Sequence, residues 1–383
     1  MNPGSGAMIR RRLGQALMVI ALASAAVSTA PVHAQEPAPI TAPGTVTAAT
    51  SLPHSFWIPG AANASKLTYW STGPLNRPAL STGALFLPPG DPPDGGWPVI
   101  SWAHGTVGIS DQCAPTVTGT VGSPYLTNWL SQGYAIVATD YVGLGTPGIH
   151  AYLDGPSAAH SVIDMVRAAR GVEPSLSPRW LALGQSQGGQ AAMVTAAIAT
   201  RYAPELDYRG AVATGAPSNL ENLAPLVGPD FPRLPLTGST VFVSYLLAGL
   251  RAARPDLDID RYLTPRGTDA LARAETDCYQ DMASGLGDTA IGDLVNRPLD
   301  DPAVLAAARG MLEIPTIGYD RPVFLGQGLT DEMVPAPLAL KLAAELAANR
   351  QPVTFRTYPT GHIETMRAAL PESLSFVRNL FQP

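Results

Sequence analysis

The chain has 383 residues, of which 46% are hydrophobic and 14% are charged, and its formal net charge is −6 at pH 7. This composition is typical of a globular protein with a sizeable core, and it excludes an intrinsically disordered chain. The acidic balance and the lack of a basic stripe argue against nucleic-acid binding, and they make a strongly anionic membrane a poor target.

The first 34 residues predict an export signal that is not part of the fold. Residues 10–12 are three arginines, residues 13–27 form an apolar stretch, and Val32-His33-Ala34 is a small-x-small cleavage site. We expect cleavage after Ala34 and a secreted or periplasmic mature chain. Its net charge is −9 instead of −6, because three arginines and no acidic residue leave with the leader. An uncleaved amino-terminal anchor is the alternative.

The next elements read as strands. Residues 35–55 are rich in Pro and Ala and predict extended chain, and residues 66–72 and 80–87 predict antiparallel strands. Residues 97–102 and 134–140 are almost continuously apolar, which is typical of central parallel strands that are covered on both faces. The amino-terminal part of the fold is therefore expected to be a sheet that turns from antiparallel to parallel.

One serine is set in the most informative segment of the chain. After a predicted helix over 156–172, the apolar run 180–183 leads into Gly184-Gln185-Ser186-Gln187-Gly188, and an alanine-rich helix is predicted over 187–203. Strand, sharp turn and helix are the context of the G-x-S-x-G nucleophile elbow. Glycines are needed beside the serine because a Cβ there would collide with a neighbouring strand or helix. We interpret Ser186 as a nucleophile.

A long insertion is predicted between two later strands. The strand expected over 210–217 is followed only about 105 residues later by the strand before Asp331, whereas ordinary crossovers are far shorter. We expect residues 218–317 to form a mainly helical cap. Its most helical stretches are residues 220–226, 239–253 and 302–311.

The stretch 241–250 inside this insertion is apolar on nearly all faces. Two interpretations are open. It could be the core of the cap itself, or it could wall a hydrophobic acyl pocket, with transient contact between the cap and a lipid surface.

The partners of a serine nucleophile follow in the order acid, then histidine, in an α/β-hydrolase. His362 is the only histidine after Ser186, and it follows a strand-like stretch over 352–358. Asp331 lies where an apolar strand ends in a glycine-rich loop, before a helix predicted over 337–349, and active-site groups gather at the carboxyl ends of such strands. The neighbouring Glu332 is the alternative acid.

These residues predict acyl transfer through a Ser186–Asp331–His362 triad. Neutral His362 would take the serine proton while Asp331 fixes the imidazole tautomer. The oxyanion needs backbone N–H donors, for which we expect Gln187 together with Gly105 or Thr106. His104 is interpreted as a residue that orders the loop.

Several segments together resemble one known family. These are the elbow, Trp102-Ala103-His104-Gly105-Thr106, Gln112-Cys113-Ala114-Pro115, the segment 140–145, and Gly326-Gln327-Gly328-Leu329-Thr330-Asp331. The chain resembles the secretory lipase family, of the lipase A type, over about residues 50–382. The resemblance implies an α/β-hydrolase fold, with a mostly parallel central sheet, helices on both faces and a helical cap. It also implies a Ser-Asp-His esterase or lipase.

The two cysteines, Cys113 and Cys278, are an even number in a chain expected to be exported, which suggests a disulfide. The family resemblance supports this pairing, and a pair of free thiols is the alternative. Neither cysteine has another metal-binding residue type at ligand spacing, so we expect no metal.

The sequence as a whole predicts a secreted serine carboxylic-ester hydrolase that works through an acyl-enzyme on a small-molecule or lipid ester. The hydrolase core would comprise residues 35–217 and 318–383. No cofactor and no obligate protein partner are expected. The alternatives are an acyltransferase or peptidase with the same triad, and a catalytically silent, hydrolase-like binding protein.

Overall fold

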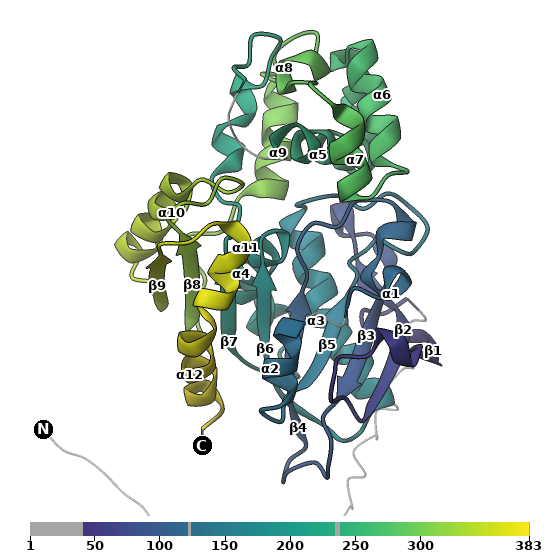
Figure 1. Ribbon diagram of the computed structural model, residues 1–383, viewed down its shortest axis with the longest axis vertical. Coiled ribbons are helices and arrows are strands. Elements are labelled where there is room, and N and C mark those ends of the chain that lie inside the picture. The colour runs from purple at the N-terminus through teal and green to yellow at the C-terminus, as the bar shows by residue number, and fades with distance from the viewer. Residues whose placement is uncertain (1–40, 122–123, 234–237, 383) are drawn as a thin grey trace, which may run out of the picture. The chain divides into compact units, whose positions relative to one another are not determined.

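A nine-stranded sheet organises the part of the chain that the computed structural model describes, which is residues 41–121, 124–233 and 238–382 (Figure 1). The predicted leader, residues 1–34, lies outside these residues. The strands are β1 (Val46–Ser51), β2 (Asn63–Thr72), β3 (Pro78–Leu87), β4 (Trp97–Ala103), β5 (Ala135–Thr139), β6 (Leu176–Gln185), β7 (Asp207–Thr214), β8 (Val323–Gly328) and β9 (Val353–Tyr358).

The order of strands across the sheet is β1-β2-β3-β5-β4-β6-β7-β8-β9. Strands β1, β2, β3 and β5 pair in antiparallel fashion, and every pair from β5 onward is parallel. The predicted antiparallel start and the central parallel strands are thus confirmed. Because β4 to β9 run in one direction, their carboxyl ends meet at the same edge of the sheet.

Helices cover both faces of the sheet, and the alternation of side chains along β4 shows why. Val99 and Ala103 lie in the cluster that packs against α3 and α4, whereas Ile100 and Trp102 lie in the cluster that packs against α2 and α12. A strand with two apolar faces requires a covering layer on each side. The helices outside the insertion are α1 (Pro115–Thr118), α2 (Pro124–Leu130), α3 (Gly155–Val172), α4 (Gln187–Tyr202), α10 (Ala336–Ala348), α11 (His362–Ala368) and α12 (Leu370–Phe381).

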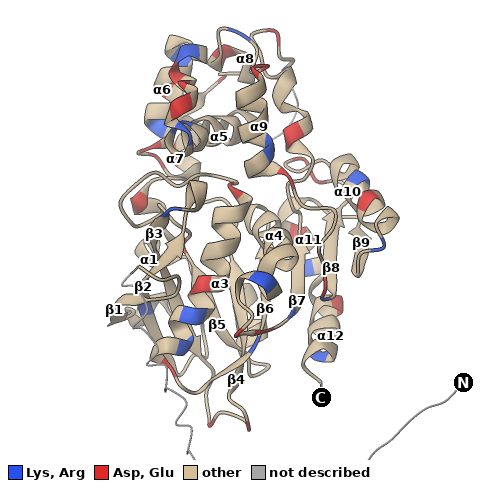
Figure 2. Cartoon of the chain, turned by 180° about the vertical axis from the view of Figure 1, so that it is seen from behind, with Lys and Arg blue, Asp and Glu red and all other residues tan. Residues whose placement is uncertain are grey.

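Residues 215–322, which we call the inserted segment, connect β7 to β8 and supply most of a second hydrophobic core, to which Ile109 and residues 151–153 also contribute. The helices of this segment gather beyond the carboxyl ends of the strands (Figure 1). Acidic and basic residues are interspersed along its helix α6 rather than gathered by sign (Figure 2). Its helices are α5 (Ser239–Ala253), α6 (Pro265–Ala274), α7 (Tyr279–Leu286), α8 (Ile291–Leu294) and α9 (Pro302–Leu312).

The prediction of a helix over 220–226 is only partly correct. These residues form two short 3-10 turns, Leu220–Asn222 and Ala224–Leu226. Pro225 lies in the second turn, and because proline has no backbone N–H it cannot continue a helical hydrogen-bond ladder. None of the helices in the described part of the chain combines the length and apolar character needed to cross a membrane.

A disulfide joins Cys113 to Cys278, as the family resemblance implied. Cys113 ends a 3-10 turn in the loop after β4, and Cys278 is the residue before α7. A hydrogen bond of 3.0 Å from the backbone N–H of Tyr279 to the carbonyl of Val107 lies beside it. The inserted segment is therefore attached covalently to the loop that follows β4.

We expect loss of this disulfide to destabilise the folded chain. The cross-link closes a sequence separation of 165 residues, and removing a native disulfide typically lowers the free energy of unfolding by about 2–5 kcal/mol. The paired replacement Cys113→Ser/Cys278→Ser should therefore lower the midpoint of urea unfolding. Mass spectrometry of alkylated wild type, with and without reduction, is the control for the bond itself. A variant with an unchanged midpoint would contradict the prediction.

Candidate active site

Ser186 lies in the turn between β6 and α4, with backbone angles φ 58° and ψ −122°. Non-glycine residues adopt such a conformation only when the surrounding structure enforces it. A Cβ added at Gly184 would collide with the carbonyl of Gly188, and one added at Gly188 would collide with the carbonyl of Ala103. The predicted need for both glycines is confirmed, and the turn is pressed against β4.

His362 and Asp331 form a buried pair. The Nδ1 atom of His362 lies 2.7 Å from Oδ2 of Asp331, and the two residues are 3% and 7% exposed. The other carboxylate oxygen, Oδ1, accepts hydrogen bonds from the backbone N–H groups of Met333 (2.9 Å) and Val334 (2.8 Å). Glu332 is exposed and makes no such pair. With Nδ1–H donated to the carboxylate, Nε2 of His362 is left as a proton acceptor.

Ser186 and His362 approach each other around the end of β7. The backbone N–H of Ser186 donates to the carbonyl of Thr214 at 2.9 Å, and a Cβ added at the next residue, Gly215, would lie 3.0 Å from Cε1 of His362. No hydrogen bond between described residues joins Ser186 to His362. Such bonds often form only when substrate is bound. All three predicted residues lie at the carboxyl edge of the sheet.

The predicted oxyanion donors also lie beside Ser186. Gln187 is the first residue of α4, so its backbone N–H has no acceptor within the helix. A Cβ added at Gly105 would lie 3.6 Å from Cβ of Ser186. The backbone N–H groups of Gly105 and Thr106 have no hydrogen-bond acceptor among the described residues. Gln187 and Gly105 therefore each have an N–H available near the serine, and the N–H of Thr106 follows that of Gly105 in the chain.

A stack of three buried rings supports this region. The ring of Tyr141 lies between those of His104 (centroids 4.5 Å apart) and His150 (5.5 Å), and its hydroxyl donates to the carbonyl of His104 at 2.9 Å. Tyr141 is fully buried, so it is a buttress of the loop rather than a residue at the mouth of the site. Nδ1 of His104 lies 2.6 Å from the carbonyl of Gly105, which fits the predicted loop-ordering role.

Sequence reasoning missed a contact between His150 and Gln187. Nε2 of His150 lies 2.8 Å from Nε2 of Gln187, and Nδ1 of His150 lies 3.0 Å from the carbonyl of Val142. The carbonyl requires His150 to donate from Nδ1, so its Nε2 accepts from the Gln187 amide. Burial lowers the pKa of His150 to about 4, which keeps the ring neutral in this arrangement. The contact spans 37 residues of sequence and no local pattern signals it.

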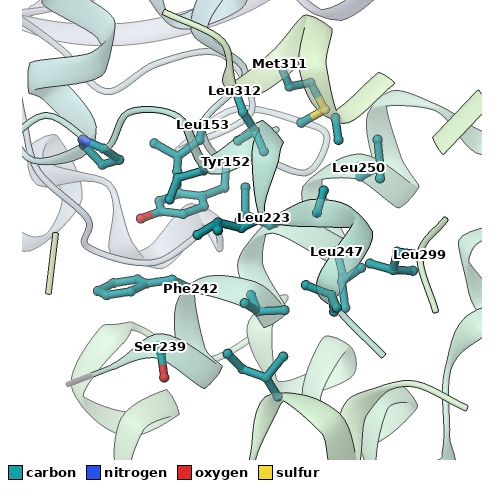
Figure 3. Close-up of a pocket in the computed structure, with 18 of the residues that line it drawn as sticks. Tyr152, Leu153, Leu223, Ser239, Phe242, Leu247, Leu250, Leu299, Met311 and Leu312 are labelled. Carbon is teal, nitrogen blue, oxygen red and sulfur yellow. The ribbon is translucent and has the colours of Figure 1, made fainter. Parts of the chain in front are cut away.

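An apolar cavity of about 200 Å³ extends from Ser186 into the inserted segment. Side chains of α5 and α9 surround it (Figure 3). The helix α5 has two apolar sides, because Tyr245 and Ala248 pack in the core of the inserted segment while Phe242, Val243 and Leu246 face the cavity. The stretch thus contributes both to this core and to the wall of the cavity, whereas acyl binding there and contact with a lipid surface stay predictions. Within the described residues, no group of three or more His, Cys, Asp or Glu side chains is placed to hold a metal ion.

Comparison with solved structures confirms the predicted α/β-hydrolase fold. Candida antarctica lipase A in its closed state superposes with a TM-score of 0.75 at 22% identity, covering 89% of this chain and 82% of that chain. The rice cell wall degrading esterase LipA from Xanthomonas oryzae gives a TM-score of 0.71 at 20% identity, covering 88% of this chain and 98% of that chain.

Similarity in sequence points to one family. Lipase A of Moesziomyces aphidis is 26% identical over 353 residues, which cover 82% of this chain and 71% of that protein. A secreted triacylglycerol lipase of Malassezia furfur is 24% identical over 70% of this chain and 75% of its own length. A Mycobacterium tuberculosis protein named as a probable inactive lipase is 24% identical over 88% of this chain and 78% of its own length. The secretory lipase family matches residues 111–383. This chain therefore belongs to the secretory lipase family, and it is an ester hydrolase.

Proposed function

We propose that the chain hydrolyses carboxylic esters through an acyl-enzyme on Ser186. In this triad His362 is the general base, and Asp331 is the carboxylate that orients the histidine ring. The observation that carries this proposal is the 2.7 Å contact between Nδ1 of His362 and Asp331, at the same sheet edge as the strained turn of Ser186. This contact leaves the other ring nitrogen free to take the proton of the serine hydroxyl.

The first half of the reaction forms the acyl-enzyme. Nε2 of His362 accepts the Ser186 proton as the serine oxygen attacks the ester carbon, and the resulting imidazolium gives that proton to the departing alcohol. Asp331 stabilises the imidazolium, and its own position is fixed by the N–H groups of Met333 and Val334. In the second half, Nε2 of His362 takes a proton from water as the water oxygen attacks the acyl carbon. The imidazolium then gives that proton to the Ser186 oxygen as the bond from this oxygen to the acyl carbon breaks and the carboxylic acid leaves.

The negative charge of the tetrahedral intermediate needs fixed donors. We assign them to the backbone N–H of Gln187 and to that of Gly105 or Thr106. The start of α4 adds the positive end of its helix dipole at the same place. The side-chain contact of Gln187 with His150 holds the first residue of that helix.

The substrate class follows from the cavity. Its walls are almost entirely aliphatic and aromatic side chains, with Ser186 at one side, so it fits an apolar acyl chain better than a peptide. The relatives named as triacylglycerol lipases act on esters of this kind. We therefore propose a lipid or small-molecule carboxylic ester, and no acceptor other than water.

Two further proposals concern the organisation of the chain. Residues 218–317 form a cap over a core of residues 35–217 and 318–383, and the cap makes transient contact with a lipid surface.

The chain is secreted or periplasmic after cleavage behind Ala34. The family and the Cys113–Cys278 disulfide support export, because disulfides persist in oxidising compartments.

Replacement of the nucleophile tests the function directly. We expect Ser186→Ala to lower kcat on p-nitrophenyl esters, from acetate to palmitate, by roughly 10⁴-fold or more. The matched control Ser284→Ala, at an exposed serine of α7, should keep wild-type activity. A wild type without activity on any ester would favour the peptidase or the silent binding protein, the latter being the state that the name of the Mycobacterium relative describes.

A second pair of variants tests the acid. Asp331→Asn should lower kcat by on the order of 10³- to 10⁴-fold, because the amide cannot stabilise the imidazolium and can favour the wrong tautomer. Glu332→Gln, at the exposed neighbouring residue, should leave kcat unchanged. Steady-state kinetics on one soluble ester compares the two. The assignment fails if Glu332→Gln is the slower variant.

The buried His150 should make stability depend on pH. Its pKa is about 4 in the folded chain, against an ordinary value of 6.5. Between these values the unfolded chain binds a proton that the folded chain does not, so the free energy of unfolding falls as the pH drops from 6.5 to 4. The loss is at most about 3 kcal/mol.

His150→Gln has no proton to bind in this window, so its loss on acidification should be smaller than that of wild type. Urea unfolding at several pH values between 4 and 7 measures the two slopes. Parallel curves for the two proteins would exclude His150 as a cause of the pH dependence.

A further inference from the structure

Tyr152 lies between the apolar cavity beside Ser186, which we call the acyl cavity, and residues 104–107, which we call the oxyanion loop. Its ring lines the cavity together with Ser186, and in Figure 3 its hydroxyl oxygen points away from Leu250 and Leu299. That hydroxyl lies 2.6 Å from Oγ1 of Thr106. Within the described part of the chain, each of the two hydroxyls has the other as its one side-chain partner. The triad mechanism proposed above makes no use of this contact.

The direction of this hydrogen bond follows from acidity. The distance of 2.6 Å fits either direction. A phenol is a stronger acid than an aliphatic alcohol, which favours Tyr152 as the donor and Oγ1 of Thr106 as the acceptor. Burial raises the pKa of Tyr152, which keeps the phenol protonated at neutral pH. Because Thr106 accepts from Tyr152, the proton of its own hydroxyl is free to point elsewhere.

Thr106 directly follows a residue that lies beside Ser186, where negative charge develops. The preceding residue, Gly105, packs against Ser186, since a Cβ added there would lie 3.6 Å from Cβ of the serine. A hydroxyl that already accepts one hydrogen bond is polarised and becomes a stronger donor. A preorganised hydroxyl next to the backbone donors would strengthen an oxyanion site.

We propose that Tyr152 is a positioning residue that orients the hydroxyl of Thr106 toward the oxyanion, so that the Thr106 side chain adds a donor to those of the backbone. This inference rests on the proposed ester hydrolysis by Ser186. It assigns Thr106 a role for its side chain, separate from that of its N–H group. It also means that Tyr152, a residue of the cavity wall, contributes through its hydroxyl to the stabilisation of the oxyanion.

The inserted segment holds Tyr152 in this position. The ring of Tyr245 on α5 packs edge-on against that of Tyr152, with centroids 5.6 Å apart. A Cβ added at Gly249, one turn further along α5, would lie 2.7 Å from the backbone nitrogen of Tyr152, so helix and backbone are in close contact. The donor geometry at Thr106 therefore depends on where α5 lies.

Four variants test the role of the two hydroxyls on a soluble p-nitrophenyl ester. Tyr152→Phe keeps the ring in the cavity wall and should lower kcat by about tenfold with KM unchanged. Thr106→Val keeps shape and backbone N–H but has no hydroxyl, and should lower kcat by on the order of 10²-fold. Thr106→Ser restores the hydroxyl and should recover most of wild-type kcat. Tyr208→Phe is the matched control, because Tyr208 lies at the start of β7, away from the site, and its hydroxyl has no hydrogen-bond partner among the described residues.

A double-variant cycle separates positioning from packing. If Tyr152 acts through Thr106, Tyr152→Phe should have no further effect on kcat in the Thr106→Val background. Additive effects, or a higher KM with unchanged kcat in Tyr152→Phe, would overturn the inference. If Tyr152→Phe fails to fold, the two Thr106 variants decide whether the Thr106 hydroxyl is a donor. The inference then requires a higher kcat for Thr106→Ser than for Thr106→Val, and equal values would overturn it.

A failure of the proposed ester hydrolysis by Ser186 can be distinguished from a failure of this inference. If Ser186→Ala stays active, ester hydrolysis by the triad is wrong and this inference falls with it. If Ser186→Ala is inactive while Tyr152→Phe and Thr106→Val match wild type, only the role of the two hydroxyls is wrong.

Discussion

The turn that carries Ser186 can close only because two of its positions have no side chain. The carbonyl of Gly188 occupies the space of a Cβ at Gly184, and the carbonyl of Ala103 occupies that of a Cβ at Gly188. This contact presses the start of α4 against the end of β4. The serine is thereby held at φ 58° above the sheet edge, with Gly105 directly beside it. The other residues of the site are arranged around this close contact between the backbones of α4 and β4, which the two glycines permit.

Much of this arrangement is local in sequence and was therefore predictable. The glycine spacing, the apolar run before it and the alanine-rich helix after it lie within one short stretch, and they specify strand, turn and helix without any distant contact. The order of acid and histidine along the chain needed only the topology of the fold. The choice between Asp331 and Glu332 is different. It depends on which carboxylate the N–H groups of Met333 and Val334 meet, and the backbone of the loop decides this.

The parts that sequence reasoning missed are contacts between distant segments. His150 meets Gln187 across 37 residues, and Tyr152 meets Thr106 across 46. No spacing rule pairs these residue types, because the approach is set by how the loop after β5 packs against the start of α4 and against the loop after β4. The short turns around Pro225 illustrate the opposite failure. There the apolar pattern suggested a helix, although a single proline in the second turn was enough to prevent a continuous one.

Several contacts link the inserted segment to the loops after β4 and β5. The Cys113–Cys278 bond, the hydrogen bond from Tyr279 to Val107 and the packing of Tyr245 on Tyr152 all join α5 or α7 to the loops after β4 and β5. A displacement of α5 large enough to reshape the cavity would therefore pull on Tyr152 and, through α7, on Val107 and Cys113, which follow the proposed oxyanion donor Thr106. Cavity shape and donor geometry are thus coupled through covalent and packed contacts. An acyl chain that fits the wall formed by α5 would stabilise the same arrangement that orients the donors, so binding of the chain and stabilisation of the oxyanion would reinforce each other.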